Sequence, residues 1–342
     1  MNRMRNIEWF RALACLNVVL LHLNSWSFDR AKLMRGGYTI YLMIDILTRF
    51  AVPGFMLITG SFIFQKAENM PKKEFYLYAL RKVIVPTLLY SAGYCAFLYA
   101  KGTLSVLMLN DVFDWKEPLV LWLHGKPFGH LWYMYMLMGL YLFIPVILWV
   151  RKHLTLRLWF VVGVICLMAS SIVNLSNLLG PVWIFCWIQY IGYFIIGDVI
   201  HRVWKRQSMT VAILSFIAAG IAFLMMLWVC KKSYTIFQPK SLLAFVLSFG
   251  IYFGFYNLNI QKDNKVITIL ARRSAEIYFL HGGVITVINI LMNFRPVQYK
   301  YQILYYLFGE ASVIFTCLIV LKIVEIVKNK IIGTKVNALI DN

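Results

Sequence analysis

Charged side chains, and acidic ones above all, are scarce in this chain. Only 14% of the 342 residues are charged, and 14 Asp and Glu stand against 34 Lys and Arg, whereas 61% of the residues are hydrophobic. The mean hydropathy of +0.72 is not that of a soluble domain. The basic excess alone would suggest nucleic acid, but that function needs a basic face on a soluble fold. The composition therefore predicts a membrane protein that binds no nucleic acid.

Close cysteine pairs, linkers and internal repeats are also missing. The six cysteines are scattered, mostly within apolar segments, and form no metal or redox motif. No long Ser-, Gly- or Pro-rich linker and no low-complexity tract marks a second domain. We therefore expect residues 1–342 to form a single integral-membrane domain that holds no metal. The lack of a convincing repeat weakens a transporter interpretation, because many carriers are built from two related halves.

Apolar runs of nearly 20 residues, by contrast, recur along the whole chain. A helix of that length crosses a hydrocarbon core of about 30 Å. The sequence thus predicts an all-α, polytopic membrane protein with about ten transmembrane helices. The expected spans are residues 9–27, 38–64, 83–100, 131–150, 158–175, 182–200, 211–229, 241–259, 274–293 and 304–327.

The basic residues predict how these spans are oriented. With the N-terminus inside, the segments on that side hold 20 of the 34 Lys and Arg, the outer segments hold 11, and Arg11, Arg49 and Lys322 lie within spans, Lys322 near the inner end of its span. Basic residues are enriched in cytoplasmic loops, so we expect both termini in the cytoplasm. Attraction to anionic membrane lipids accounts for most of the excess charge. Polar residues interrupt the first span and no small-residue cleavage site follows it, so we expect it to be uncleaved.

Arg11 and His22 stand out because they lie inside the first apolar span. Eleven residues make three helical turns plus about 20°, so the two side chains share one helix face, about 16 Å apart. A charge within a membrane helix is costly and usually faces a cavity or the bundle interior. Imidazole can take a proton from an attacking alcohol, and guanidinium suits phosphate. The pair indicates chemistry inside the membrane, with an anion-binding group towards the cytoplasm and a base towards the outer side, although a helix-joining His and a helix-anchoring Glu8–Arg11 pair are the structural alternatives.

Five segments, in order along nearly the whole chain, resemble motifs of the membrane-bound acyltransferase-three family. They are EWFRALACLNVVLLH (8–22), RFAVPGFMLITGS (49–61), RKVIVP (81–86), HLWYMYMLMGLYLFIP (130–145) and SAEIYFLH (274–281). The chain departs from the family pattern at Thr59, Ala275 and Phe279. Among the branches of the family, it is similar to the short O-acetyltransferases of surface polysaccharides.

The resemblance implies an acetyl-CoA-dependent O-acyltransferase in a bacterial inner, or plasma, membrane. Its donor is cytoplasmic acetyl-CoA, and its acceptor is a hydroxyl of a cell-surface glycan or of a lipid-linked precursor. The competing hypothesis is a transporter or flippase for a glycan or lipid, in which the same buried charges line a conduit. The sequence leaves the acceptor and the oligomeric state open.

The expected site residues fall into three groups. The catalytic candidates are His22 as base, Glu8 and His281. The donor-binding candidates are Arg11, Arg49, Arg81 and Lys82. The acceptor-binding candidates are His130, Trp132 and Tyr278. An interhelical hydrogen bond explains His281 equally well, and membrane anchoring explains Arg81 and Lys82 equally well. His124 and His130 are six residues apart, but no cluster of carboxylates or cysteines completes a metal site with them.

Overall fold

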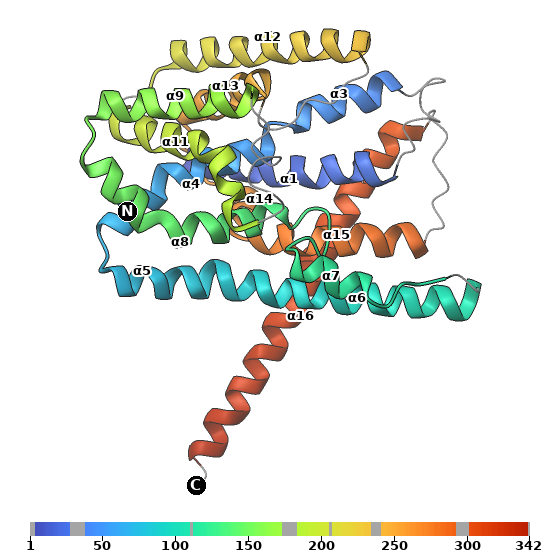
Figure 1. Cartoon of the computed structure of the whole chain (residues 1–342). Helices are drawn as coiled ribbons and strands as arrows, with labels where there is room; N and C mark the ends of the chain where they lie inside the picture. The colour runs from blue at the N-terminus through green and yellow to red at the C-terminus, as the bar shows by residue number, and fades with distance from the viewer. Residues whose placement is uncertain are drawn as a thin grey trace. The chain divides into compact units, whose positions relative to one another are not determined.

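The computed structural model describes residues 4–27, 38–109, 112–172, 183–204, 207–233, 241–291 and 301–340. The structure is 88% helical, and its described residues contain no strand, so the predicted all-α class is confirmed. Figure 1 shows the helices in chain order. They are α1 (Arg5–Ser27), α3 (Tyr38–Thr48), α4 (Ala51–Glu68), α5 (Lys72–Ala79), η1 (Leu80–Ile84), α6 (Val85–Leu109), α7 (Glu117–Leu123), α8 (Trp132–Lys152), α9 (Leu156–Ile172), η2 (Trp183–Tyr190), α11 (Ile191–Val203), α12 (Met209–Ser233), α13 (Leu242–Asn257), α14 (Lys265–Arg272), α15 (Ser274–Leu291) and α16 (Gln302–Ile340).

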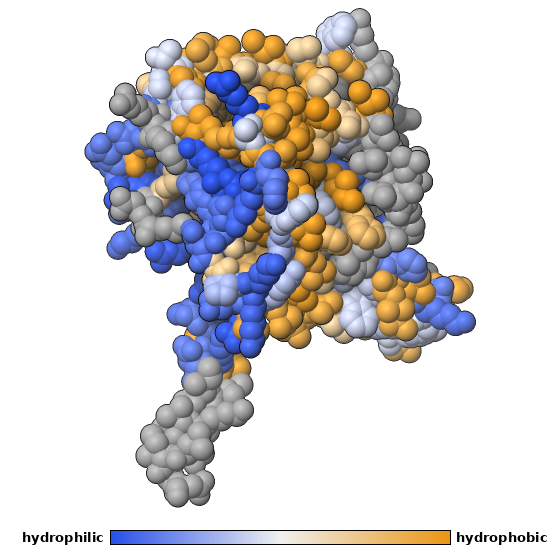
Figure 2. All heavy atoms as spheres, turned by 60° about the vertical axis from the view of Figure 1, so that its left-hand side comes forward, coloured by the Kyte–Doolittle hydropathy of each residue, from blue (hydrophilic) through white to orange (hydrophobic). Residues whose placement is uncertain are grey.

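Seven helical segments among the described residues are long and apolar enough to cross a membrane. They are Arg5–Ser25, Tyr38–Glu68, Lys72–Leu107, Trp132–Lys152, Met209–Lys231, Ser274–Leu291 and Gln302–Lys330. Two shorter apolar helices, α9 and α13, coincide with further expected spans. Figure 2 shows apolar residues covering much of the visible surface, with hydrophilic residues gathered in patches between them. The polytopic membrane class is thus supported, while the total of ten spans and the cytoplasmic termini stay predictions.

The expected span 38–64 is divided into α3 and α4 by a turn at Arg49 and Phe50. Pro53 explains the break, because proline has no N–H to donate to the Arg49 carbonyl and its ring clashes with that carbonyl. The α-helical pattern resumes with a 2.8 Å hydrogen bond from Gly54 N to the Phe50 carbonyl. The sequence predicted Arg49 within a continuous helix. The structure places it instead at the turn between α3 and α4.

Two other expected spans begin with irregular turns. The π-helical turn η1 joins α5 to α6, and Pro86, which cannot donate to the Lys82 carbonyl, lies two residues after it. The expected span 182–200 begins as the 3-10 helix η2 and is α-helical only from Ile191. The structure thus differs from the expected regular helices at the entry of both spans.

The chain forms two compact units, which we describe separately. Unit 1 consists of Met1–Ala14 and Arg49–Asp263, and unit 2 of Cys15–Thr48 and Asn264–Asn342. Helix α1 contributes its first ten residues to unit 1 and the remainder to unit 2.

In unit 1, α4 and α11 approach closely because glycines face their contact. A Cβ atom on Gly60 would overlap the backbone of Phe194, and one on Gly197 would overlap the carbonyl of Leu57. Small residues allow such close backbone approach between membrane helices. The approach also lets the Ser61 hydroxyl donate to the Gly197 carbonyl at 3.0 Å.

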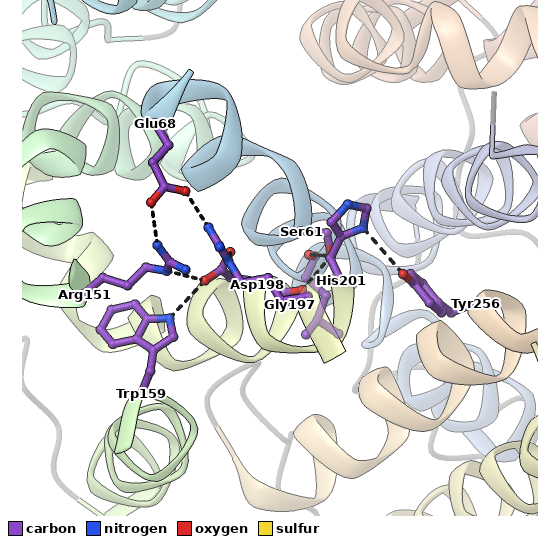
Figure 3. A network of polar contacts seen from close by, with 10 residues as sticks. Ser61, Glu68, Arg151, Trp159, Gly197, Asp198, His201 and Tyr256 are labelled. Atoms are coloured by element: carbon purple, nitrogen blue, oxygen red, sulfur yellow. Dashed lines mark hydrogen bonds and ion pairs between the residues drawn. The ribbon is translucent and has the colours of Figure 1, made fainter. Parts of the chain in front are cut away.

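One end of unit 1 is closed by a ring of ion pairs. Asp198 of α11 is fully buried, and its carboxylate accepts hydrogen bonds from Arg151 Nε and Arg202 Nε, each at 2.8 Å. It also accepts one from Trp159 Nε1 at 3.1 Å. Glu68, at the end of α4, binds the same two guanidiniums at 3.0 and 2.8 Å. Figure 3 shows Glu68, Arg151, Trp159 and Asp198 of this arrangement. With Arg202 included, two carboxylates balance two arginines in this charge ring.

Further contacts tie other helix ends to the same end of unit 1. Trp204, just after α11, donates its Nε1–H to the Asn257 side chain at the end of α13, at 2.7 Å. Asn6, at the start of α1, donates to the Tyr256 carbonyl at 2.7 Å. The start of α1 and the ends of α4, α8, α11 and α13 therefore lie together, and all of them adjoin segments expected in the cytoplasm.

In unit 2, a buried polar network joins α1, α3 and α16. The Asn24 amide donates to the Tyr41 carbonyl at 3.1 Å and accepts a short hydrogen bond from the Tyr306 hydroxyl. Gln302 in turn donates to that hydroxyl at 2.9 Å. This network fixes the part of α1 that carries His22.

Candidate active site

The two histidines expected to exchange protons lie side by side in unit 2. The ring of His22, on α1, and the ring of His281, on α15, have centroids 5.1 Å apart and planes inclined by 34°. His281 is fully buried, whereas His22 is partly exposed. Residues 259 positions apart in the sequence thus form one imidazole pair, which the motif positions alone did not predict.

The backbone fixes which nitrogen of His281 can exchange a proton. Its Nδ1 lies 2.7 Å from the Tyr278 carbonyl oxygen and 3.2 Å from that of Ile277. A carbonyl oxygen can only accept, so Nδ1 carries the proton and Nε2 is the basic nitrogen. The Tyr278 ring lies 5.6 Å from the His281 ring, so this acceptor-binding candidate adjoins the imidazole pair.

Arg11 lies on the part of α1 that belongs to unit 1, and its side chain is partly exposed. Its electrostatic neighbours include the Glu8 carboxylate. They also include three tyrosines, namely Tyr78 of α5, Tyr133 of α8 and Tyr252 of α13. Within the described part of the chain, its guanidinium forms no hydrogen bond or ion pair. Its five N–H donors therefore suit an anionic ligand of the planar geometry that phosphate and carboxylate offer.

The tyrosines around Arg11 are held in place by other hydroxyls. Tyr252 shares a 2.6 Å hydrogen bond with Ser61, and Tyr133 is hydrogen bonded to Thr59. Thr59 is a departure from the family pattern, yet it keeps the hydroxyl that this contact requires. The Ser61 and Thr59 hydroxyls donate to backbone carbonyls, so the hydroxyls of Tyr252 and Tyr133 donate to them. The Arg11 cluster, meaning Arg11, Tyr78, Tyr133 and Tyr252, is thus preorganised, and its free donors are those of the guanidinium.

Glu8 and Arg49 are both partly exposed in unit 1. Glu8 acts electrostatically on Arg11, as the spacing of three residues predicted. Arg49 lies at the turn between α3 and α4, whereas the sequence predicted it within a membrane helix. Its proposed donor contact is untested.

Arg81 and Lys82 lie on the exposed π-turn η1. Arg81 follows Tyr78 by three residues, so about one helical turn separates it from a member of the Arg11 cluster. This position agrees with a donor role and with membrane anchoring alike.

The remaining acceptor-binding candidates, His130 and Trp132, stand at the start of α8 in unit 1. His130 is fully buried against the rings of Tyr94 and Phe128, whose centroids lie 5.3 and 5.5 Å away. Trp132 is partly exposed, and its ring lies 5.5 Å from that of Tyr190. Both residues thus take part in aromatic packing.

Sequence analysis did not identify Asp198 or Glu310. Asp198 is the one acid in the expected span 182–200, four residues before Arg202, and this spacing was a usable signal. Burial lowers the pKa of Arg202, but hydrogen bonds to Asp198 and Glu68 raise that pKa above its ordinary value overall, so its charge is retained. Glu310 is half-buried on α16 and acts electrostatically on Cys15 of α1. Each of these two acids lies within an expected apolar span, and that placement was the signal that could have identified them.

Among the described residues, no group of three or more His, Cys, Asp or Glu side chains is placed to hold a metal ion. A family model described as an acyltransferase domain matches residues 4–322. No curated protein and no solved structure matches the chain. The matched region includes all five motif segments and draws on both units.

Proposed function

The chain belongs to acyltransferase family three, and on this premise we propose that it moves an acetyl group from cytoplasmic acetyl-CoA to a hydroxyl of a cell-surface glycan or of its lipid-linked precursor. The family supports a membrane acyltransferase. The identity of donor and acceptor, and the location in a bacterial inner membrane, are the parts that we propose.

The imidazole pair carries the proposal. In the proposed reaction, His22 takes the proton of the acceptor hydroxyl while that oxygen attacks the thioester carbon. The new C–O bond forms, the C–S bond then breaks, and the departing thiolate of coenzyme A takes up the proton. His281 lies 5.1 Å from His22, with Nδ1 committed to the Tyr278 carbonyl, so its Nε2 is suited to a second proton transfer.

The Arg11 cluster supports the donor half of the proposal. Coenzyme A carries a pyrophosphate and a 3′-phosphate, and a guanidinium binds such groups through two parallel hydrogen bonds. Arg11 lies on the first part of α1, near the end of unit 1 that adjoins the expected cytoplasmic segments. We therefore assign Arg11 to donor binding, with Arg49, Arg81 and Lys82 as further candidates.

Release of free coenzyme A distinguishes transfer from transport. Membrane vesicles containing the protein, supplied with labelled acetyl-CoA and an extract of surface glycan, should release the thiol and label the glycan. Mass spectrometry of the glycan should find acetyl groups that are absent without the gene. A carrier would bind the glycan with no thiol release, and that result would refute the proposed reaction.

A further inference from the structure

A cleft of about 430 Å³ lies in unit 1, where the α4–α5 turn meets the end of α8. Phe75 of α5 and Pro145 and Leu148 of α8 contribute apolar side chains to its lining. Phe75 is only 1% exposed and closes the floor of the cleft. None of these residues belongs to the imidazole pair or to the Arg11 cluster.

The cleft also has two basic residues, Lys72 and Lys152. Both are exposed, and within the described part of the chain neither forms an ion pair. Glu68 also borders the cleft, but its two oxygens bind Arg151 and Arg202 at 3.0 and 2.8 Å. The charge of Glu68 is thus balanced by these two arginines, and the cleft keeps a net positive charge from its two lysines.

Apolar surface continues from the cleft along α8. Trp149 lines the cleft and is 65% exposed, and Val146, one turn before it, is 58% exposed. Tryptophan is enriched at the boundary between hydrocarbon and headgroups. A ligand with an anionic head and apolar tails would therefore find both of its parts accommodated.

We propose that this cleft binds the phosphate headgroup of an anionic phospholipid, with the acyl chains lying on the exposed apolar face of α8. Basic pockets between membrane helices on the cytoplasmic side are suited to such headgroups. The exposed Trp149 and Val146 favour a lipid over a soluble phosphate compound, which has no chains to cover them. The inference does not depend on the acyl-transfer reaction.

Native mass spectrometry of the purified protein in a neutral detergent tests the proposal. The probes are dioleoyl phosphatidylglycerol and dioleoyl phosphatidylcholine, which share their chains and differ in headgroup charge. We expect the protein to retain phosphatidylglycerol in preference to phosphatidylcholine. The double variant Lys72→Gln/Lys152→Gln should lose affinity for it by about tenfold or more, with phosphatidylcholine binding unchanged.

Two matched variants separate the cleft from general charge attraction. Lys262→Gln/Lys265→Gln removes the same charge from exposed positions elsewhere and should bind phosphatidylglycerol normally. Lys72→Arg/Lys152→Arg keeps the charge and should also bind normally. Equal loss in the Lys262/Lys265 variant, or no loss in the Lys72/Lys152 variant, would overturn the proposal. Displacement of the lipid by equimolar coenzyme A would also overturn it and assign the cleft to the donor.

Discussion

The hydroxyl oxygens of Ser61 and Tyr252 lie 2.6 Å apart, and this contact ties α13 to α4 beside Arg11. Because Ser61 is itself bonded to the Gly197 carbonyl at 3.0 Å, the Tyr252 hydroxyl has a fixed position. The surroundings of Arg11 are thus set by α4, α11 and α13 before any ligand binds. Preorganised surroundings of this kind lower the cost of ordering a binding site.

Substitution of Arg11 should weaken donor binding. Arg11→Ala removes the guanidinium, and we expect the affinity for coenzyme A to fall about 10- to 100-fold, which corresponds to the loss of charge-assisted hydrogen bonds. Arg11→Lys keeps the charge but loses the paired geometry, so a smaller loss is expected. Calorimetric titration of the purified variants measures both. Unchanged affinity in the two variants would remove Arg11 from the donor site.

Substitution of His22 should abolish transfer without unfolding the protein. His22→Gln keeps a polar side chain but cannot act as a base, so we expect the rate of acetyl transfer to fall by about 10² to 10⁴. The control is His153→Gln, which changes an exposed histidine just after α8. Transfer at a near-normal rate by folded His22→Gln would rule out this residue as the base.

The charge ring of Glu68, Arg151, Asp198 and Arg202 should contribute strongly to the free energy of unfolding. Asp198→Asn leaves Arg151, with 10% of its side chain exposed, without its buried carboxylate, and we expect a loss of about 3 to 5 kcal/mol. Glu68 is more exposed, so Glu68→Gln should cost only about 1 kcal/mol. Thermal unfolding in detergent compares the two. Equal effects would show that burial of Asp198 does not govern the energetics of the ring.

The orientation of the chain can be tested by cysteine labelling. In a background without native cysteines, Lys116→Cys should react with an impermeant thiol reagent in intact cells, because that position is exposed and expected outside. Asn69→Cys, exposed at the α4–α5 turn, should react only after lysis. The reverse pattern would place the termini outside and contradict a cytoplasmic donor at Arg11.

Local patterns predicted the helical class and the seven segments that are long and apolar enough to cross a membrane. They could do so because length and hydrophobicity are properties of contiguous sequence. They did not predict the break at Arg49, although Pro53 is a readable signal. The neighbours of Arg11 divide in the same way. Glu8 followed from a spacing of three residues, whereas Tyr252 reaches Arg11 through tertiary packing that no local pattern encodes.

The imidazole pair and the charge ring show the same limit. His22 and His281 were each identified from a motif, but their proximity depends on how α1 and α15 pack in unit 2. Arg151 and Arg202 lie in segments that were used only to orient the chain. The spacing of Asp198 and Arg202 was a readable signal for one ion pair, whereas the pairing of Arg151 with Asp198 became visible only in the folded chain. Basic residues near helix ends thus serve two purposes that composition cannot separate.

The order of the ring members along the chain has a consequence for biogenesis. Glu68 and Arg151 precede Asp198, and Arg202 follows it by four residues, so synthesis of α11 completes the set. Chains fold from the N-terminus as they are made, and every member of the ring is therefore synthesised before α12 to α16. We expect the charge of Asp198 to be compensated as soon as α11 docks on α4, without waiting for these later helices.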